Sequence, residues 1–236
     1  MSNLFQIILF KPIFNVLVGL YNILPGHDIG LAIIALTVII KLVLYPLMSS
    51  SIKAQKSLQD IQPHINELKK KFGADKQALA AETMKLYKQH KVNPVASCLP
   101  VLVQIPILLA LYYVLRAGLG DTNFALLYSF VENPGSLNPV SFGLVDLAKP
   151  NYILAVLSGI AQFWQAKMLS AKRPPKAAGE GGKDEDMASI MNKQMTYFMP
   201  VVTLLVGLQL PGGLTLYWFI STVLTALQQL YIFKKV

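Results

Sequence analysis

Lys41 is the one charged residue in the apolar stretch from Ile29 to Met48, which is long enough to form a membrane-spanning helix. A lysine at that depth costs at least about 2.5 kcal/mol unless its ammonium group reaches water or a polar partner. Two interpretations are open: the side chain extends to the headgroups of the inner leaflet, or it lines a hydrated cavity between helices. No carboxylate lies in the expected spans, which favours water over a salt bridge.

Uncharged polar side chains in the other apolar stretches are candidates to share that cavity. Each one alone is typical of a hydrogen bond between helices. Together with Lys41 they predict a hydrophilic groove that is embedded in lipid and open to the cytosol. They are Gln104, Gln162, Gln165, Thr215, Thr222 and Gln228.

The positions of the acidic and histidine residues argue against catalysis. All twelve Asp and Glu residues and all three His residues lie outside the expected spans. This disfavours intramembrane metalloproteases, aspartyl proteases and proton-coupled transporters. The single cysteine, Cys98, excludes an internal disulfide, and the sequence has no phosphate-binding Gly-x-x-x-x-Gly-Lys-Ser/Thr motif. We expect no enzymatic activity, no cofactor and no metal site.

The composition places most of the chain in lipid. It has 236 residues, of which 54% are hydrophobic and only 14% are charged, whereas soluble globular domains average about 25% charged residues. The net charge of +9 is spread along the chain, so no direct nucleic-acid recognition is expected. These values predict an all-α polytopic membrane protein.

Four apolar segments, one of them divided by a turn, predict five transmembrane helices. The turn is Leu210-Pro211-Gly212-Gly213, which ends one helix and starts the next. The expected spans are residues 29–52, 93–119, 151–169, 195–210 and 213–233. Between and after them we expect a cytosolic helical hairpin at 53–92, an extracytoplasmic loop at 120–150, a flexible cytosolic loop at 170–194 and a cytosolic tail at 234–236.

Residues 1–28 are expected to contribute an amphipathic helix that lies in the membrane interface. Lys11, Asn15 and Asn22 share one face of the stretch from Phe5 to Leu24, and apolar residues cover the other face. That pattern is typical of an interfacial helix. The stretch is also long enough to span the bilayer, so this alternative stays open.

The distribution of lysines predicts the orientation in the membrane. Nine lysines lie in residues 53–92, whereas residues 120–150 hold only Lys149. Cytoplasmic loops collect Lys and Arg. The N-terminus is therefore predicted outside and the C-terminus in the cytoplasm.

The 53–92 segment predicts two short amphipathic helices. An apolar stripe repeats at steps of three and four residues, and Asp75, which follows Gly73, predicts the N-cap of the second helix. We expect the apolar faces to pack on each other, while the lysine-rich outer faces can also contact anionic lipid or a partner. The stripe consists of Leu58, Ile61, Ile65, Leu68 and Phe72.

A set of short motifs follows one order along the chain. They are the Ile29–Pro46 stretch with its single basic residue, Gln62-Pro63, Lys91-Val92-Asn93-Pro94, Cys98-Leu99-Pro100, Gln104-Ile105-Pro106, Met199-Pro200, Leu210-Pro211-Gly212-Gly213-Leu214, Leu216-Tyr217-Trp218 and Gln228-Gln229. In this order, spacing and predicted topology, the chain resembles the YidC/Oxa/Alb family of membrane protein insertases over nearly its whole length.

The resemblance implies a five-helix core with a groove open to the cytosol and the lipid but closed toward the outside. It also implies that the positive charge of the groove, here Lys41, attracts the acidic part of a substrate while the substrate's apolar helix enters the bilayer. The implied substrate groove consists of Lys41, Gln104, Gln162, Gln165, Thr215, Trp218 and Thr222. The chain departs from the family pattern at Lys41, where Arg is usual, at Ala166, where Gln is common, and at Thr222, where Asn is frequent.

The partners implied by the resemblance are nascent membrane proteins, the ribosome-nascent chain complex, the Sec translocon and membrane lipids. Lys69, Lys70 and Lys71 of the hairpin are the expected contact residues. A bacterial cytoplasmic (inner) membrane is expected because no organellar transit segment precedes the core, in a short form without the large outer domain of Gram-negative members. Two alternatives stay open: an assembly chaperone, and a small-solute channel or transporter, although no internal repeat supports a transporter.

Overall fold

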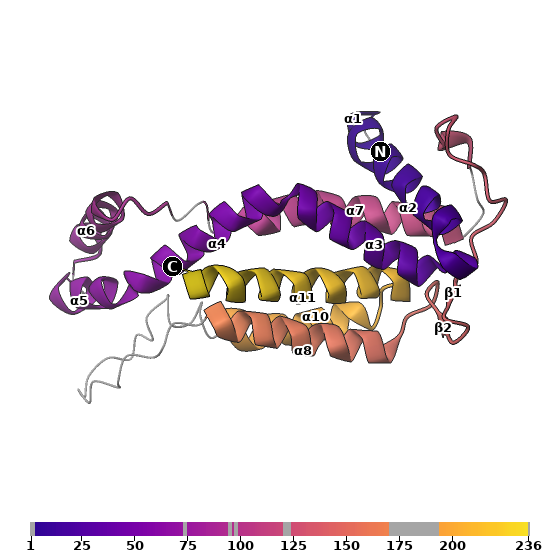
Figure 1. Ribbon diagram of the computed structural model, residues 1–236. Helices are drawn as coiled ribbons and strands as arrows, with labels where there is room; N and C mark the ends of the chain where they lie inside the picture. Colours follow the sequence, from indigo (N-terminus) through magenta and orange to yellow (C-terminus); the bar gives the residue numbers. More distant parts are fainter. Residues whose placement is uncertain are drawn as a thin grey trace.

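The computed structural model describes residues 3–72, 75–93, 96, 99–119, 124–169 and 194–235, and this part of the chain is mainly helical (Figure 1). The helices are α1 (Asn3–Phe5), η1 (Gln6–Phe10), α2 (Lys11–Ile23), η2 (Pro25–His27), α3 (Ile29–Val43), α4 (Tyr45–Asp60), α5 (Gln62–Phe72), α6 (Lys76–Gln89), α7 (Leu99–Leu119), η4 (Phe124–Leu126), α8 (Tyr152–Leu169), η5 (Gln194–Phe198), α10 (Met199–Gly207) and α11 (Gly212–Lys235). Strands β1 (Val140–Ser141) and β2 (Val145–Asp146) form an antiparallel hairpin before α8. The loop expected at 170–194 lies, except for Gln194, outside the described residues.

Helix α11 is the central element of a helical bundle. It lies between α3 and α7 on one side and α8 and α10 on the other (Figure 1). The core joins buried residues of α2, α3, α7 and α11, among them Phe14, Leu36, Leu111 and Tyr217. Helices α8 and α10 approach closely because Gly207 has no side chain, and a Cβ built there would lie 3.2 Å from the Ala155 Cβ. Small residues at such contacts are typical of helix packing in membranes.

Three helical segments of the described structure are long and apolar enough to cross a membrane. They are Asn3–Ile23, Leu99–Arg116 and Gly212–Lys234, and the bent pair α3 and α4 makes a fourth if the two helices count as one span. Helix α8 is not among them, and Thr196–Gly207 is a shorter apolar helix. By length and composition the described residues therefore support three or four crossings, and five spans remain a prediction.

The span expected at 29–52 is divided by a bend. Helix α3 ends at Val43, α4 begins at Tyr45, and the helices are bent by 69°. Pro46 lies in the first turn of α4, where it has no N–H for the preceding turn and its ring displaces the carbonyl four residues earlier. Helix α4 then continues to Asp60, so the boundary expected at residue 52 falls inside a helix.

The apolar stripe expected over 58–72 is also divided between two helices. Ile61 ends α4 and α5 begins at Gln62. Ile61 and Ile65 are buried, whereas Leu58, Leu68 and Phe72 are only partly buried. The stripe is therefore partly buried across a helix junction and does not form one continuous helical face.

The N-terminal segment α1–η1–α2 runs obliquely to the bundle (Figure 1), and its polar face is covered. The Asn15 amide donates to the Leu126 carbonyl at 3.1 Å and its oxygen accepts from the Tyr128 N–H at 2.6 Å. The Asn22 amide donates to the Glu132 carbonyl at 2.7 Å. The polar face, which we expected to contact water, thus binds the loop before β1. That the segment lies in the membrane interface and does not span the bilayer stays a prediction.

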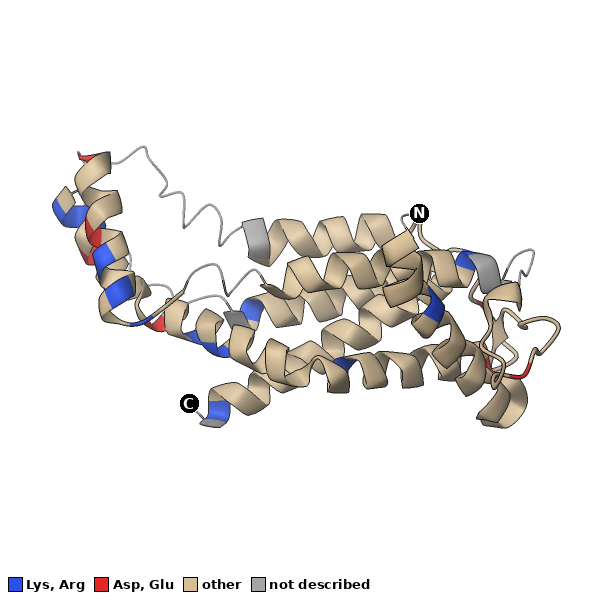
Figure 2. Ribbon diagram, turned by 90° about the horizontal axis from the view of Figure 1, so that it is seen from above, with Lys and Arg blue, Asp and Glu red and all other residues tan. Residues whose placement is uncertain are grey.

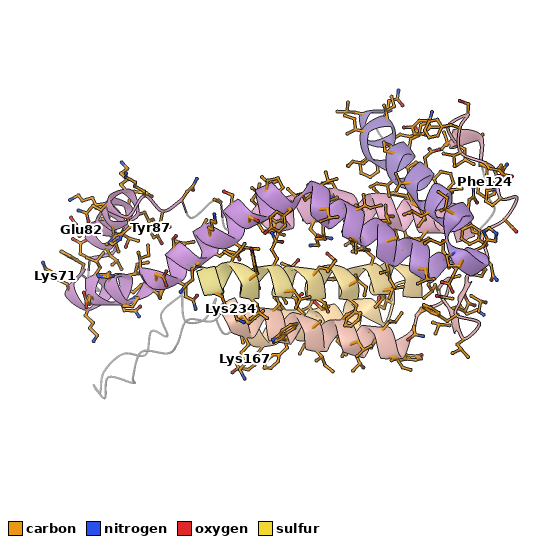
Figure 3. All side chains as sticks on the ribbon, viewed as in Figure 1. Lys71, Glu82, Tyr87, Phe124, Lys167 and Lys234 are labelled. Atoms are coloured by element: carbon orange, nitrogen blue, oxygen red, sulfur yellow. The ribbon has the colours of Figure 1, made fainter. Side chains whose placement is uncertain are left out.

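Helices α5 and α6 form a helical hairpin at the end of the bundle opposite to β1 and β2 (Figure 1). The Asp75 carboxylate accepts hydrogen bonds from the N–H groups of Gln77 and Ala78, both at 3.0 Å, which confirms the predicted N-cap; Gly73 lies outside the described residues. Charged residues gather along this hairpin (Figure 2). In Figure 3, Lys167 and Lys234 lie at the bundle end nearest the hairpin, and Phe124 lies at the other end.

Candidate functional site

The ammonium group of Lys41 lies between α3 and α11. Its Nζ donates a 2.8 Å hydrogen bond to Thr225 Oγ1 on α11. The Thr225 hydroxyl donates in turn to the Ser221 carbonyl at 2.8 Å, so its oxygen is free to accept from Lys41. A lysine ammonium group has three donors, and Thr225 takes one of them.

Lys41 also lines a cavity at the bend between α3 and α4. The cavity has a volume of about 310 Å³ and an apolar lining with a few polar groups. The Gln228 amide is held at its edge by hydrogen bonds to Ser49 Oγ at 2.9 Å and to the Tyr45 carbonyl at 3.4 Å. Leu42, Tyr45 and Tyr231 are exposed at the molecular surface, so the cavity opens outward. Its lining residues are Val38, Lys41, Leu42, Tyr45, Leu224, Gln228 and Tyr231.

No carboxylate of the described residues neutralises Lys41. The ion pairs identified there join Lys56 to Asp60 in the last turns of α4, Lys85 to Glu82 in α6, and Lys149 to Asp146 at the end of β2. Lys41 has instead a neutral hydroxyl partner and a cavity. An ammonium group in such a setting can attract an acidic group that enters the cavity, because opposite charges interact more strongly where the local dielectric is low.

Two other residues expected in the groove form hydrogen bonds inside the bundle. The Gln104 amide donates to the Tyr217 hydroxyl at 2.7 Å, and Tyr217 is 1% exposed. Thr215 is fully buried, and its hydroxyl lies 3.3 Å from the carbonyl oxygens of Gly207 and Pro211. These two residues therefore connect elements inside the bundle.

The remaining four expected groove residues are not among those that line this cavity. Thr222 is buried, and Gln162, Gln165 and Trp218 are partly exposed. Of the seven residues, Lys41 is the one that lines the described cavity. Gln228 was a polar candidate from the sequence, but Thr225 was missed. Residue type alone does not indicate which face of α11 packs against α3.

The three hairpin lysines lie at the end of α5. The Lys71 Nζ lies 5.2 Å from the centre of the Phe72 ring, and Lys70 and Lys71 are exposed. Figure 3 shows Lys71 at the tip of the α5–α6 hairpin, at the far end of the molecule from Phe124. No group of three or more His, Cys, Asp or Glu residues that could hold a metal ion occurs in the part of the chain that the structure describes.

Comparison with known proteins assigns the chain to a family. The family model described as 60Kd inner membrane protein matches residues 19–236. The chain belongs to the 60Kd inner membrane protein family. Relatives in this family include proteins named membrane protein insertase YidC. The protein of that name from Fusobacterium nucleatum is 35% identical over 208 residues, which cover 88% of this chain and 87% of the relative.

Other relatives in the 60Kd inner membrane protein family are much longer than this chain. The insertase YidC of Geobacter metallireducens is 36% identical over 96% of this chain, but the match covers 37% of that relative. The insertase YidC of Rickettsia bellii is 34% identical, and the match covers 39% of its length. A crystal structure of an active YidC insertase has the same fold, with a TM-score of 0.58 and 23% identity over 92% of this chain and 45% of that one.

Proposed function

We propose that this membrane protein insertase receives the acidic, hydrophilic part of a substrate in the cavity beside Lys41. The observation that carries the proposal is the Lys41 ammonium group, which bonds to Thr225 and faces a cavity with no described carboxylate beside it. A substrate carboxylate that enters the cavity is attracted by the Lys41 ammonium group, and it keeps more of its hydration there than it would in bare lipid. The barrier to moving a polar segment into the bilayer is then lower.

The short length of α10 supports the same step. Helix α10 has 9 residues, and η5 before it adds 5. Together they reach about 21 Å at about 1.5 Å per residue, which is shorter than the hydrocarbon core of about 30 Å. Local thinning of the membrane beside α10 shortens the distance that a polar segment travels, and the chemistry needs no nucleotide and no metal.

The orientation completes this proposal. The lysine-rich α5–α6 hairpin and the ends of α8 and α11 face the cytoplasm, with five crossings, the N-terminus outside and the C-terminus inside a bacterial cytoplasmic membrane. Support comes from Figure 2, in which charged residues gather at the hairpin end, because cytoplasmic segments collect Lys and Arg. Nascent membrane proteins are the substrates, and Lys69, Lys70 and Lys71 contact the ribosome-nascent chain complex. Action beside the Sec translocon is part of the same proposal.

Reconstitution of the purified chain alone in liposomes tests this function. A small single-span substrate with an acidic tail is added, and its protection from external protease reports insertion. Lys41→Arg should retain insertion because the cation is kept, whereas Lys41→Glu should lose it because the acidic tail is repelled. Equal insertion by Lys41→Glu and the parent protein contradicts the proposal.

Two controls make the assay specific. A matched substrate with a neutral tail should discriminate much less between the two Lys41 variants. Small-solute flux through the same vesicles, without any inserted substrate, would favour a channel or transporter instead. Insertion in the absence of Sec components separates an insertase from a chaperone that only assists assembly.

A further inference from the structure

The β1–β2 hairpin carries a bulky aromatic residue in a backbone conformation that disfavours it. Phe142 and Gly143 connect the strands with φ of +51° and +69°, and the Leu144 N–H donates to the Ser141 carbonyl at 3.0 Å. Positive φ at both central residues is the pattern of a type I′ turn, which favours Asn-Gly or Asp-Gly. A bulky residue with positive φ is a rare and unfavourable arrangement. Turn propensity therefore does not explain Phe142.

Packing within the described chain does not explain it either. Phe142 is 63% exposed and Leu144 is 86% exposed. The turn thus presents two large apolar side chains to the surroundings, one on each side of Gly143. An observed backbone strain of this kind points to a functional reason for the residue.

The hairpin is held firmly on the start of α3 through Asp28. Its Oδ1 accepts from the N–H groups of Gly30 and Leu31 at 2.8 and 3.0 Å, and from the Ser141 hydroxyl at 2.6 Å. Its Oδ2 accepts from the Phe142 N–H at 2.5 Å. Burial raises the pKa of Asp28, but these hydrogen bonds outweigh it and hold the pKa below the ordinary value of 3.8. The direction of the turn relative to α3 is therefore well defined.

The apolar tip lies at the end of the bundle where α8 and α11 begin. Behind it, the carbonyl groups of Leu147 and Lys149 accept from the N–H groups of Gly213 and Gly212 at 2.9 and 2.8 Å, so the hairpin lies where α11 begins. Helix α8 starts a few residues later with Tyr152 and Ile153, which are 73% and 72% exposed. This end of the bundle is opposite to the charged α5–α6 hairpin (Figures 1 and 2).

We propose that Phe142 and Leu144 insert into the interfacial region of the lipid leaflet at this end of the bundle and anchor the hairpin there. An exposed apolar tip at the end of a bundle of membrane helices lies near the lipid headgroups, and the apolar faces of interfacial helices are buried about 5–10 Å into the boundary between headgroups and acyl chains. The lipid supplies the contact that the protein core does not. The inference rests on the placement of the helices in a membrane and not on the role of Lys41.

The anchor has a consequence for the groove. Asp28 connects the hairpin to α3, and Lys41 follows 13 residues later, about 20 Å along the helix at about 1.5 Å per residue. A hairpin held at the interface therefore sets the depth of the Lys41 ammonium group in the bilayer.

Depth-dependent fluorescence quenching tests this anchor. The full chain has one cysteine, so Cys98→Ser allows a single NBD label at Leu144→Cys, and Ser136→Cys in the same loop serves as the matched control. Both proteins are reconstituted in phosphatidylethanolamine and phosphatidylglycerol vesicles that contain lipids with a doxyl quencher near the headgroup or near the chain end. We expect a blue-shifted emission at position 144 and stronger quenching by the shallow doxyl group, with neither effect at position 136.

A second variant separates lipid contact from the fold of the turn. Phe142→Asn suits a positive φ and keeps the turn, but it removes the remaining large apolar side chain of the labelled tip, so the label at 144 should be quenched less. A water-like, unquenched emission at 144 in a protein with a normal elution profile overturns the anchor. A blue-shifted emission that the doxyl lipids do not quench, and that increases with the protein-to-lipid ratio, also overturns the anchor, because a second copy of the chain then covers the tip. Both outcomes are read without the insertion assay.

Discussion

The Lys41 ammonium group on α3 and the Thr225 hydroxyl on α11 are joined by a 2.8 Å hydrogen bond although 184 positions separate them in the sequence. This bond connects α3 and α11, which line the cavity together with Tyr45 of α4. It also holds the single charge of the Ile29–Met48 stretch at the cavity wall. The chemistry of the site therefore depends on the contact between two helices as well as on the residue type at position 41.

Removal of the Thr225 hydroxyl is expected to weaken both stability and function. Thr225→Val should lower the free energy of unfolding by about 0.6 kcal/mol, the average for hydrogen bonds between membrane helices, and by at most about 1.7 kcal/mol. Insertion of an acidic-tailed substrate should fall, because Lys41 is no longer held at the cavity. Thr225→Ser keeps the hydroxyl and should behave like the parent in both measurements. If Val and Ser behave alike, the bond has no role in positioning Lys41.

The Asp28 carboxylate makes stability dependent on pH. Because its folded pKa is lowered, its contribution is present above the unfolded value of 3.8 and is lost as the pH falls through the folded pKa. Asp28→Asn can still cap α3, but it loses the second carboxylate oxygen that accepts from Phe142. The midpoint temperature of thermal unfolding in detergent should therefore fall more steeply between about pH 6 and about pH 3 for the parent than for the variant. Parallel curves would assign the acid sensitivity to other groups.

The contact between α3 and the hairpin leaves no room for a side chain at position 30. A Cβ at Gly30 would overlap the Ser141 side chain, so Gly30→Ala should cost about 1–3 kcal/mol of unfolding free energy. Gly19 in α2 is the matched control, since nothing lies within 4 Å of a Cβ there. Gly19→Ala should stabilise the helix by about 0.5–1 kcal/mol. Chemical or thermal unfolding of the two variants measures the difference, and equal effects would remove the steric explanation.

Pro46 is expected to maintain the bend beside the cavity. Pro46→Ala restores a backbone N–H and removes the ring that displaces the preceding carbonyl, so α3 and α4 should straighten from their 69° bend. Spin labels at Leu31 and Lys53 should then move apart in a pulsed electron resonance measurement. Leu47→Ala, at the next position, leaves the proline in place and should keep the parent distance. An unchanged distance in Pro46→Ala would mean that tertiary packing, and not the proline, causes the bend.

The sequence was sufficient for the class of the protein and for several local features. Low charge and long apolar stretches predict membrane helices because polar groups are costly in lipid. Asp75 is the N-cap of α6, and α10 ends before the predicted Pro-Gly turn, where α11 begins at Gly212. These features depend on neighbouring residues, so local patterns are enough to predict them. Family membership followed from motifs in a fixed order, and the match over residues 19–236 agrees with it.

Tertiary structure decided which polar residues meet. Gln104 and Thr215 have the same character as Gln228 in the sequence, but the first two bond within the bundle and Gln228 lines the cavity beside Lys41. The face that each helix turns toward its neighbour depends on side-chain packing over many residues, such as the close contact of Gly207 with Ala155. The polar face of α2 was visible as Asn15 and Asn22, yet its partners are carbonyl groups more than 100 positions away.

The physical reason is the range over which each interaction acts. Hydrophobicity and capping are properties of a few consecutive residues, and a chain carries them before it folds. The Lys41–Thr225 bond and the Asp28–Phe142 bond exist only after distant segments have packed. The sequence by itself therefore determined that one lysine lies in an apolar helix, and only the packing of α3 against α11 decided what that lysine contacts.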